Sequence, residues 1–236
     1  MPILTPPLQV APPLQQQSKP LLILQIADSA FPIGGFAHSN GLEAAMKWGH
    51  VTNPYDLKRF AQDSLMQIAR GSLPFVRDAH RGQAFEELDA LCNAFLNSHI
   101  ANQASRRQGR TLLNTAATVF ELPDLASLLD LVQDRKLACH LAPVFGHFTH
   151  CLDLQEQESL QLFLFMTLRS LVSSAVRLSL VGPLRGQTIQ HELSNYVEEL
   201  VTNFSAGKMA SVFQTAPLID LMQATHDRAY SRLFQS

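Results

Sequence analysis

The sequence is poor in charge and lacks long apolar runs, and each shortage excludes a class of protein. Asp, Glu, Lys and Arg make up 16% of the 236 residues, and the net charge is −2. A nucleic-acid-binding surface needs clustered Lys and Arg, and the densest basic spot here is only Arg106, Arg107 and Arg110. The longest apolar run, Leu162 to Met166, is too short to span a bilayer. We therefore expect neither nucleic acid nor a membrane among the partners, and a surface partly covered by other proteins.

Cysteine is also scarce, and its pattern indicates a reducing compartment. The three cysteines, Cys92, Cys139 and Cys151, are odd in number, far apart and free of any Cys-x-x-Cys spacing. Such usage favours buried thiols over a disulfide framework. A basic segment followed by an unbroken apolar stretch is missing near the N-terminus, so we identify no signal peptide and expect a cytoplasmic protein.

Sequence motifs of catalysis are missing as well. The Gly-Lys pair at Gly207-Lys208 lacks the upstream glycine and the following hydroxyl of a phosphate-binding P-loop. Gly-x-Ser-x-Gly and His-Glu-x-x-His do not occur. We expect no catalytic residues, no cofactor and no enzymatic activity. A helical enzyme built on Glu43 with His38, or on His191 with Glu192, stays open as an alternative.

Histidine is the one metal-ligating residue type that gathers in the chain. His140, His147, His150 and Cys151 fall within twelve residues, and the spacing of three puts His147 and His150 on one helix face. A structural metal site normally needs four ligands. We therefore predict no tight metal site, and a carrier that holds nickel weakly on His and Cys side chains is the alternative function.

The apolar periodicity predicts an all-α protein. Residues 1–20 hold six of the 13 prolines and several glutamines, which favours a flexible tail over a helix. From residue 21 on, apolar residues recur at steps of three and four, with no persistent alternation of period two. We predict a single compact domain over 21–236 with about eight to ten helices, including helices near 21–27, 54–71, 74–96, 102–120, 124–132, 155–180, 187–204 and 217–233.

Two segments are unusual for a helical domain. Phe31 to Glu43 combines a proline, two adjacent glycines and three large apolar residues in a tight loop, and Ser39 is placed to cap the next helix. The C-terminus, Tyr230 to Ser236, carries two aromatics, a leucine and an arginine, although chain ends are usually polar. An apolar end must pack, either on its own domain or on a partner.

With three further segments, these two resemble the urease accessory protein UreF family. The loop Phe31 to Glu43 is similar to its N-terminal signature, and His226 to Ser236 to its closing motif. Between them lie segments similar to its mid-chain Arg/Ser and Gly motif, its Phe-Gly pair and its long central helix: Ser105 to Gly109, Phe145-Gly146, and Ala175 to Leu178 followed by Gly182. The resemblance runs from about Leu21 to Ser236.

The resemblance implies an all-helical homodimer that assembles with other proteins. Its expected partners are UreD (called UreH in some systems), the GTPase UreG and apo-urease, into which the complex inserts nickel. The loop and the C-terminal tail are the expected contact segments, through Pro32, Gly34, Gly35, Phe36, His38, Ser39, Gly41, Glu43, Tyr230, Arg232, Leu233 and Phe234. Many members carry Tyr where this chain has Phe36, and the tail 1–20 has no counterpart that we can match.

Overall fold

The fold was analysed in a computed structural model that describes residues 18–33 and 39–206. These residues form eleven α-helices and no strand, which confirms the all-α prediction. The helices are α1 Lys19–Ala27, α2 Leu42–Lys47, α3 Pro54–Gly71, α4 Leu73–His80, α5 Phe85–Phe95, α6 His99–Phe120, α7 Pro123–Asp134, α8 Leu141–Cys151, α9 Glu156–Arg177, α10 Pro183–Glu192 and α11 Ser194–Phe204.

Local capping explains where α3 begins. The Asn53 side chain accepts hydrogen bonds from the backbone N–H groups of Tyr55 (2.9 Å) and Asp56 (3.1 Å), and Pro54 occupies the first helical position. These contacts satisfy donors that a helix start leaves unpaired. The predicted bounds of this helix, 54–71, are confirmed.

Two helices that we expected to be continuous are each divided in two, so these predictions were wrong. The segment 74–96 breaks between α4 and α5, where Gly82 adopts a left-handed conformation (φ +80°) that glycine accepts without strain. The segment 187–204 breaks at Leu193, which is buried with ψ near −2°. No Gly or Pro stands at this second break, so the sequence carries no local signal for it.

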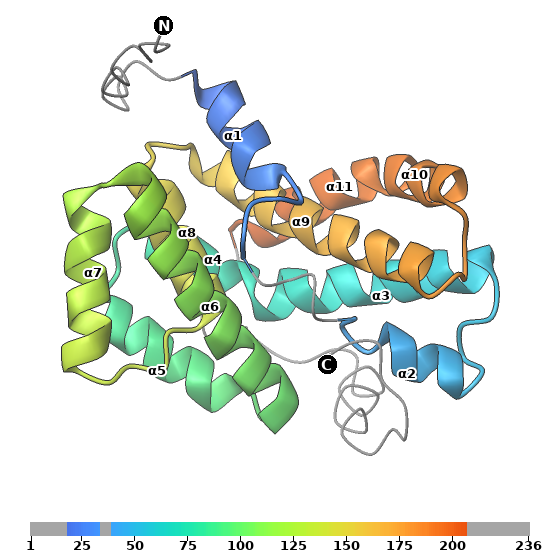
Figure 1. Ribbon diagram of the computed structural model, residues 1–236, viewed down its shortest axis with the longest axis horizontal. Helices are drawn as coiled ribbons and strands as arrows, with labels where there is room; N and C mark the ends of the chain where they lie inside the picture. Colours follow the sequence, from blue (N-terminus) through green and yellow to red (C-terminus); the bar gives the residue numbers. More distant parts are fainter. Residues whose placement is uncertain (1–17, 34–38, 207–236) are drawn as a thin grey trace, which may run out of the picture.

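The central element is α9, which crosses the middle of the molecule (Figure 1). Its start has a capping box between Gln155 and Glu158. It packs against α10, α4, α11, α3, α1 and α8, and its buried residues extend round most of the helix. By length and composition α9 could cross a membrane, and more than half of its apolar window is buried inside the bundle. A core helix of a helical protein has these properties.

Two glycines allow α8 to lie unusually close to its neighbours. A methyl group on Gly146 of α8 would lie 2.1 Å from the carbonyl oxygen of Val76 in α4. A methyl group on Gly109 of α6 would lie 2.1 Å from the carbonyl oxygen of Cys139, just before α8. Any larger residue at either position would force the backbones apart. The α4–α8 and α6–α8 contacts therefore depend on these glycines.

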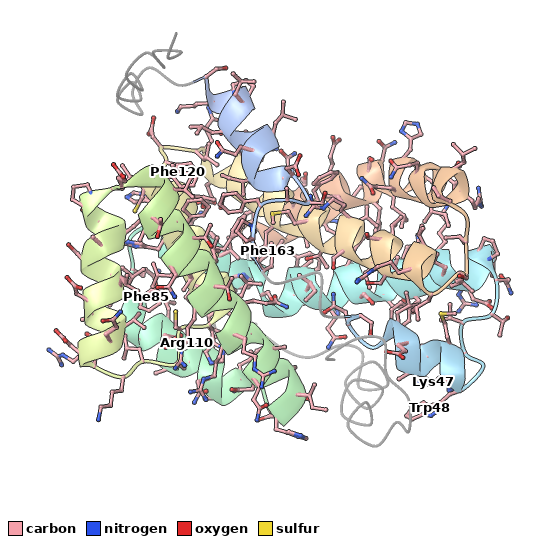
Figure 2. The ribbon with its side chains drawn as sticks, viewed as in Figure 1. Lys47, Trp48, Phe85, Arg110, Phe120 and Phe163 are labelled. Carbon is pink, nitrogen blue, oxygen red and sulfur yellow. The ribbon has the colours of Figure 1, made fainter. Side chains whose placement is uncertain are left out.

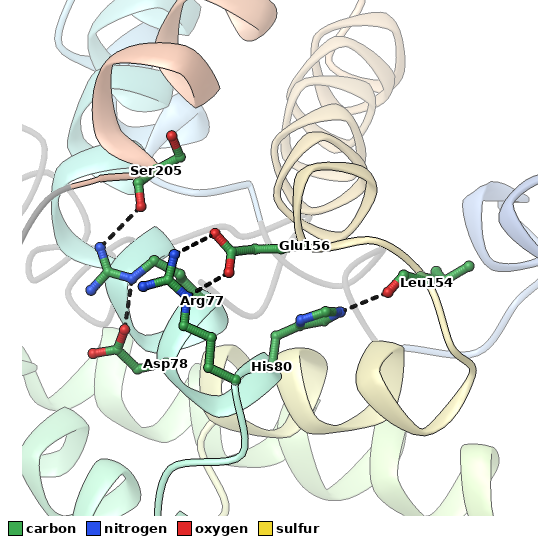
Figure 3. A network of polar contacts seen from close by, with 7 residues as sticks. Arg77, Asp78, His80, Leu154, Glu156 and Ser205 are labelled. Atoms are coloured by element: carbon green, nitrogen blue, oxygen red, sulfur yellow. Dashed lines mark hydrogen bonds and ion pairs between the residues drawn. The ribbon is translucent and has the colours of Figure 1, made fainter.

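A polar network holds the far end of α4 (Figure 3). Arg77 is buried, pairs with Asp78 (2.6 Å) and donates from Nη1 to the carbonyl oxygen of Ser205 (3.3 Å). Arg81 pairs with both oxygens of Glu156 (2.5 and 2.8 Å) at the start of α9. His80 Nε2 lies 3.0 Å from the carbonyl oxygen of Leu154. This network joins α4 to the end of α11 and to the α8–α9 turn.

Some sequence predictions fall partly or wholly outside the described residues. Of the predicted tail 1–20, residues 1–17 lie outside them, whereas Lys19 and Pro20 already form the first turn of α1. The helix predicted over 217–233 also lies outside them.

We predict that Gly146→Ala lowers the free energy of unfolding by about 3 kcal/mol or more, since its methyl group would overlap the α4 backbone. Urea denaturation followed by circular dichroism measures this. Gly182→Ala is the control, because nothing lies within 4 Å of its added methyl group and its φ is negative. A loss below 1 kcal/mol in Gly146→Ala would contradict the proposed close approach.

Candidate partner-docking site

The first half of the loop identified in the sequence is fixed on the helices by aromatic packing. The Phe31 ring lies 6.2 Å from that of Phe120 and 6.4 Å from that of Phe148, centroid to centroid. Asp28 Oδ1 accepts from the Ala30 N–H (2.6 Å), and Thr115 Oγ1 donates to the Pro32 carbonyl oxygen (3.2 Å). Residues 28–33 therefore lie in a defined course across α6 and α8; Figure 2 marks Phe120 at the end of α6.

The second half of the loop leads into α2 through two left-handed residues. Asn40 (φ +52°) and Gly41 (φ +84°) turn the chain, and Gly41 is the N-cap of α2. The expectation that Ser39 caps this helix was wrong in detail. Its Oγ is 3.5 Å from the Glu43 N–H, which is too long for a strong cap, because the left-handed turn places Gly41 at the capping position.

The structure places four of the twelve expected contact residues, and only Pro32 is exposed. Ser39 and Gly41 are buried, and Glu43 is 5% exposed and pairs with Lys47 at 3.2 Å. These three therefore shape the turn from inside. The other eight lie outside the described residues: Gly34, Gly35, Phe36, His38, Tyr230, Arg232, Leu233 and Phe234.

A cavity of about 710 Å³ lies beside this loop, between α9, α10 and the start of α8. Its volume is within the range of ordinary ligand pockets. Its walls are largely apolar, with Phe31, Ile33, Phe145, Phe163, Val172 and Val176 among the lining side chains. Ile33 and Asn40, which flank residues 34–38, both line it. We call it the Arg169 pocket, after the charged residue described next.

Arg169 and Arg177 bring positive charge into the lining of the Arg169 pocket. Arg169 donates from Nη1 to the Ala27 carbonyl oxygen at the end of α1, and Arg177 Nη2 lies 3.3 Å from Ser174 Oγ. Burial lowers the pKa of both guanidinium groups, and the nearby charge of Asp28 partly offsets this for Arg169. Both still carry a charge at neutral pH. Sequence reasoning missed Arg169, whose signal was an arginine inside the apolar stripe of the longest helical pattern.

The mid-chain segment Ser105 to Gly109 packs in the interior, beside the entry to α8. The buried Asp89 carboxylate accepts from the backbone N–H groups of Cys139 (2.9 Å) and His140 (2.7 Å). The His140 ring lies 3.1 Å from Ser105 Oγ and 3.2 Å from Asn93 Oδ1. These contacts fix the entry to α8 against α5 and α6, so Ser105 positions the helix that forms one wall of the Arg169 pocket.

The histidines and cysteines suggested as nickel ligands do not gather into one metal site among the described residues. His150 contacts the ring of His80 (5.6 Å), and His147 contacts that of Phe85 (6.4 Å). Within residues 18–33 and 39–206, no group of three or more His, Cys, Asp or Glu side chains is placed to hold a metal ion. Burial raises the pKa of the Cys139 thiol to about 12 and of the Cys151 thiol to about 11, and also raises that of Cys92.

Comparison with known proteins identifies the family. The sequence model of UreF matches residues 51–194. The chain belongs to the UreF family. It is 37% identical to urease accessory protein F of Arabidopsis thaliana, over 90% of both chains. It is 36% identical to the protein of that name in Oryza sativa subsp. indica, over 89% of this chain and 82% of the relative. It is 30% identical to UreF of Arthrobacter sp. (strain FB24), over 92% and 96%.

Membership of the UreF family confirms the resemblance on which the docking segments were chosen, and gives the chain a general role in urease maturation. In this UreF-family chain the segments similar to the family's central motifs, around Ser105, Gly109 and Gly146, are packing determinants.

We predict that Asp89→Asn destabilises the protein by about 2–3 kcal/mol, because an amide N–H₂ would face a backbone N–H donor in a buried site. Urea denaturation measures the loss. Asp130→Asn, at an exposed position of α7, is the matched control and should change stability by less than about 0.5 kcal/mol. Equal stability of the two variants would show that Asp89 does not anchor α8.

The buried histidines predict a loss of stability in mild acid. Burial lowers the pKa of His140 to about 4 from the ordinary 6.5, against the opposing charge of Asp89, and lowers those of His80 and His147 too. Between the folded and unfolded pKa values of a histidine, the unfolded chain binds a proton that the folded chain does not. The free energy of unfolding therefore decreases as the pH is lowered through this range. We expect His140 to contribute about 1 kcal/mol of loss between pH 7.5 and 5.5.

Urea denaturation at both pH values checks this, with His140→Gln for comparison. The variant should lose about 1 kcal/mol less than the wild type between the two pH values. An identical loss in both proteins would exclude His140 as a source of the pH dependence.

Proposed function

We propose that the chain is a non-catalytic scaffold of urease maturation. In this proposal it binds UreD (UreH), recruits the GTPase UreG, and so supports the insertion of nickel into apo-urease. It acts as a homodimer within that complex, in the cytoplasm. The observation that carries the proposal is membership of the UreF family, since its curated relatives are named for an accessory role in making urease.

Helix α1 supports a docking role. Leu22 and Ile26 are buried toward the body, whereas Leu21 and Leu24 are each 65% exposed. The helix is therefore apolar on both sides, and among the described residues one side packs on the body while the other is exposed; it projects from the bundle in Figure 1. Its outward leucines are suited to contact with another polypeptide.

The division of labour between proteins also supports the proposal. The sequence lacks the P-loop that would cradle a nucleotide phosphate, so GTP hydrolysis is assigned to UreG. This chain contributes surfaces. One of them is the C-terminal segment 226–236, which we propose as a docking surface. The described part of the chain ends close to Ser205, whose carbonyl oxygen accepts from Arg77 (Figure 3).

We predict that deletion of residues 226–236 prevents stable association with UreD while the helical body keeps its melting temperature. Arg232→Ala should weaken association by about 2–5 kcal/mol, as expected for removal of a buried interface charge. Size-exclusion chromatography with light scattering, alone and with UreD, measures both. Arg185→Ala is the control, because its exposed pair with Glu192 lies on α10.

An undiminished complex after the deletion would refute the docking role of the tail. A wild-type chain that fails to associate with UreD at all would refute the proposed function.

A further inference from the structure

The charged side chains in the described lining of the Arg169 pocket are all positive. Its described lining includes Arg169 and Arg177 but no Asp, Glu, Lys or His side chain. The acid whose charge acts on Arg169 is Asp28, which is exposed and is not among the residues that line the pocket. Two guanidinium groups in a mostly apolar cavity make a site with net positive charge.

Both arginines lie on one face of α9. Arg169, Ser173 and Arg177 are spaced by four residues, so they follow one another along the same side of the helix. All three line the pocket, and Ser173 is exposed between the two charges. Arg169 is held in place by its hydrogen bond to the Ala27 carbonyl, which uses one of the five N–H donors of a guanidinium group.

The apolar walls indicate what else the ligand carries. Phe145, Phe163 and Val172 are among the side chains that line the cavity. A peptide supplies a carboxylate together with apolar side chains that would match these walls.

We propose that the Arg169 pocket receives an acidic peptide segment of a partner polypeptide, with a carboxylate on the Arg169 and Arg177 face of α9. The proposal rests on the proposed function, because it takes the partner from the urease maturation complex. It adds which chemical groups meet: a carboxylate of the partner and the guanidinium groups of Arg169 and Arg177. Of the loop predicted to meet partners, Phe31, Pro32, Ile33 and Asn40 line the same pocket.

Substitution of Ser173 tests the sign of the ligand charge. Ser173→Glu places a carboxylate between the two arginines, where it would pair with them and repel an acidic ligand. Ser173→Gln has nearly the same size without the charge, and Ser173→Lys adds a positive charge. We expect Ser173→Glu to raise the dissociation constant for UreD, or for UreG on the UreD complex, at least tenfold. The Gln variant should stay within threefold, and the Lys variant should bind as tightly as the wild type or tighter.

The measurement is biolayer interferometry with the full chain, with melting temperatures as a folding control. Equal weakening by Glu and Gln would indicate a steric effect, and equal binding of all variants to both partners would show that no acid enters; either result overturns the inference. Normal partner binding with an altered monomer–dimer equilibrium would identify a second copy as the occupant and also overturn it. If the wild type itself does not assemble, the proposed function fails, which is a separate outcome.

Discussion

The close approach of α8 to its neighbours determines the rest of the architecture. Gly146 lets the α8 backbone reach α4, and Gly109 lets the chain entering α8 reach α6. With α8 in this place, the Phe145 ring lies 5.1 Å from Phe163 of α9, and Phe148 meets Phe31 from the loop. The same helix thus holds one wall of the Arg169 pocket and the segment at its rim. Because the pocket depends on backbone contacts between helices, its shape is set by the core.

Much of the fold follows from the sequence, because caps and periodicity act locally. The Asn53-Pro54 start of α3 and the apolar stripe of α9 predicted their helices with bounds close to those observed. The breaks at Gly82 and Leu193 were missed for different reasons. A single glycine inside a helical pattern is compatible with a continuous helix, so Gly82 did not decide the first break. Leu193 is a buried leucine with no breaking residue beside it, so no local pattern marks the second break.

The candidate site was predictable only in part. The loop from Phe31 was recognisable by composition, but the sequence could not show that Ser39, Gly41 and Glu43 face inward. Arg169 was hidden because an arginine in an apolar stripe is common at a helix edge, and its importance comes from α10 and the loop meeting α9 around it. The loop near residue 31 and the helices α9 and α10 are more than one hundred residues apart in the sequence, so a local sequence pattern cannot show that they meet.

The burial of the thiols bears on how a protein with free cysteines resists oxidation. Thiolate, rather than thiol, is the form that reacts with oxidants. Burial raises the pKa of Cys92, Cys139 and Cys151, so all three are thiols at neutral pH. The packed interior therefore protects these free cysteines from oxidation.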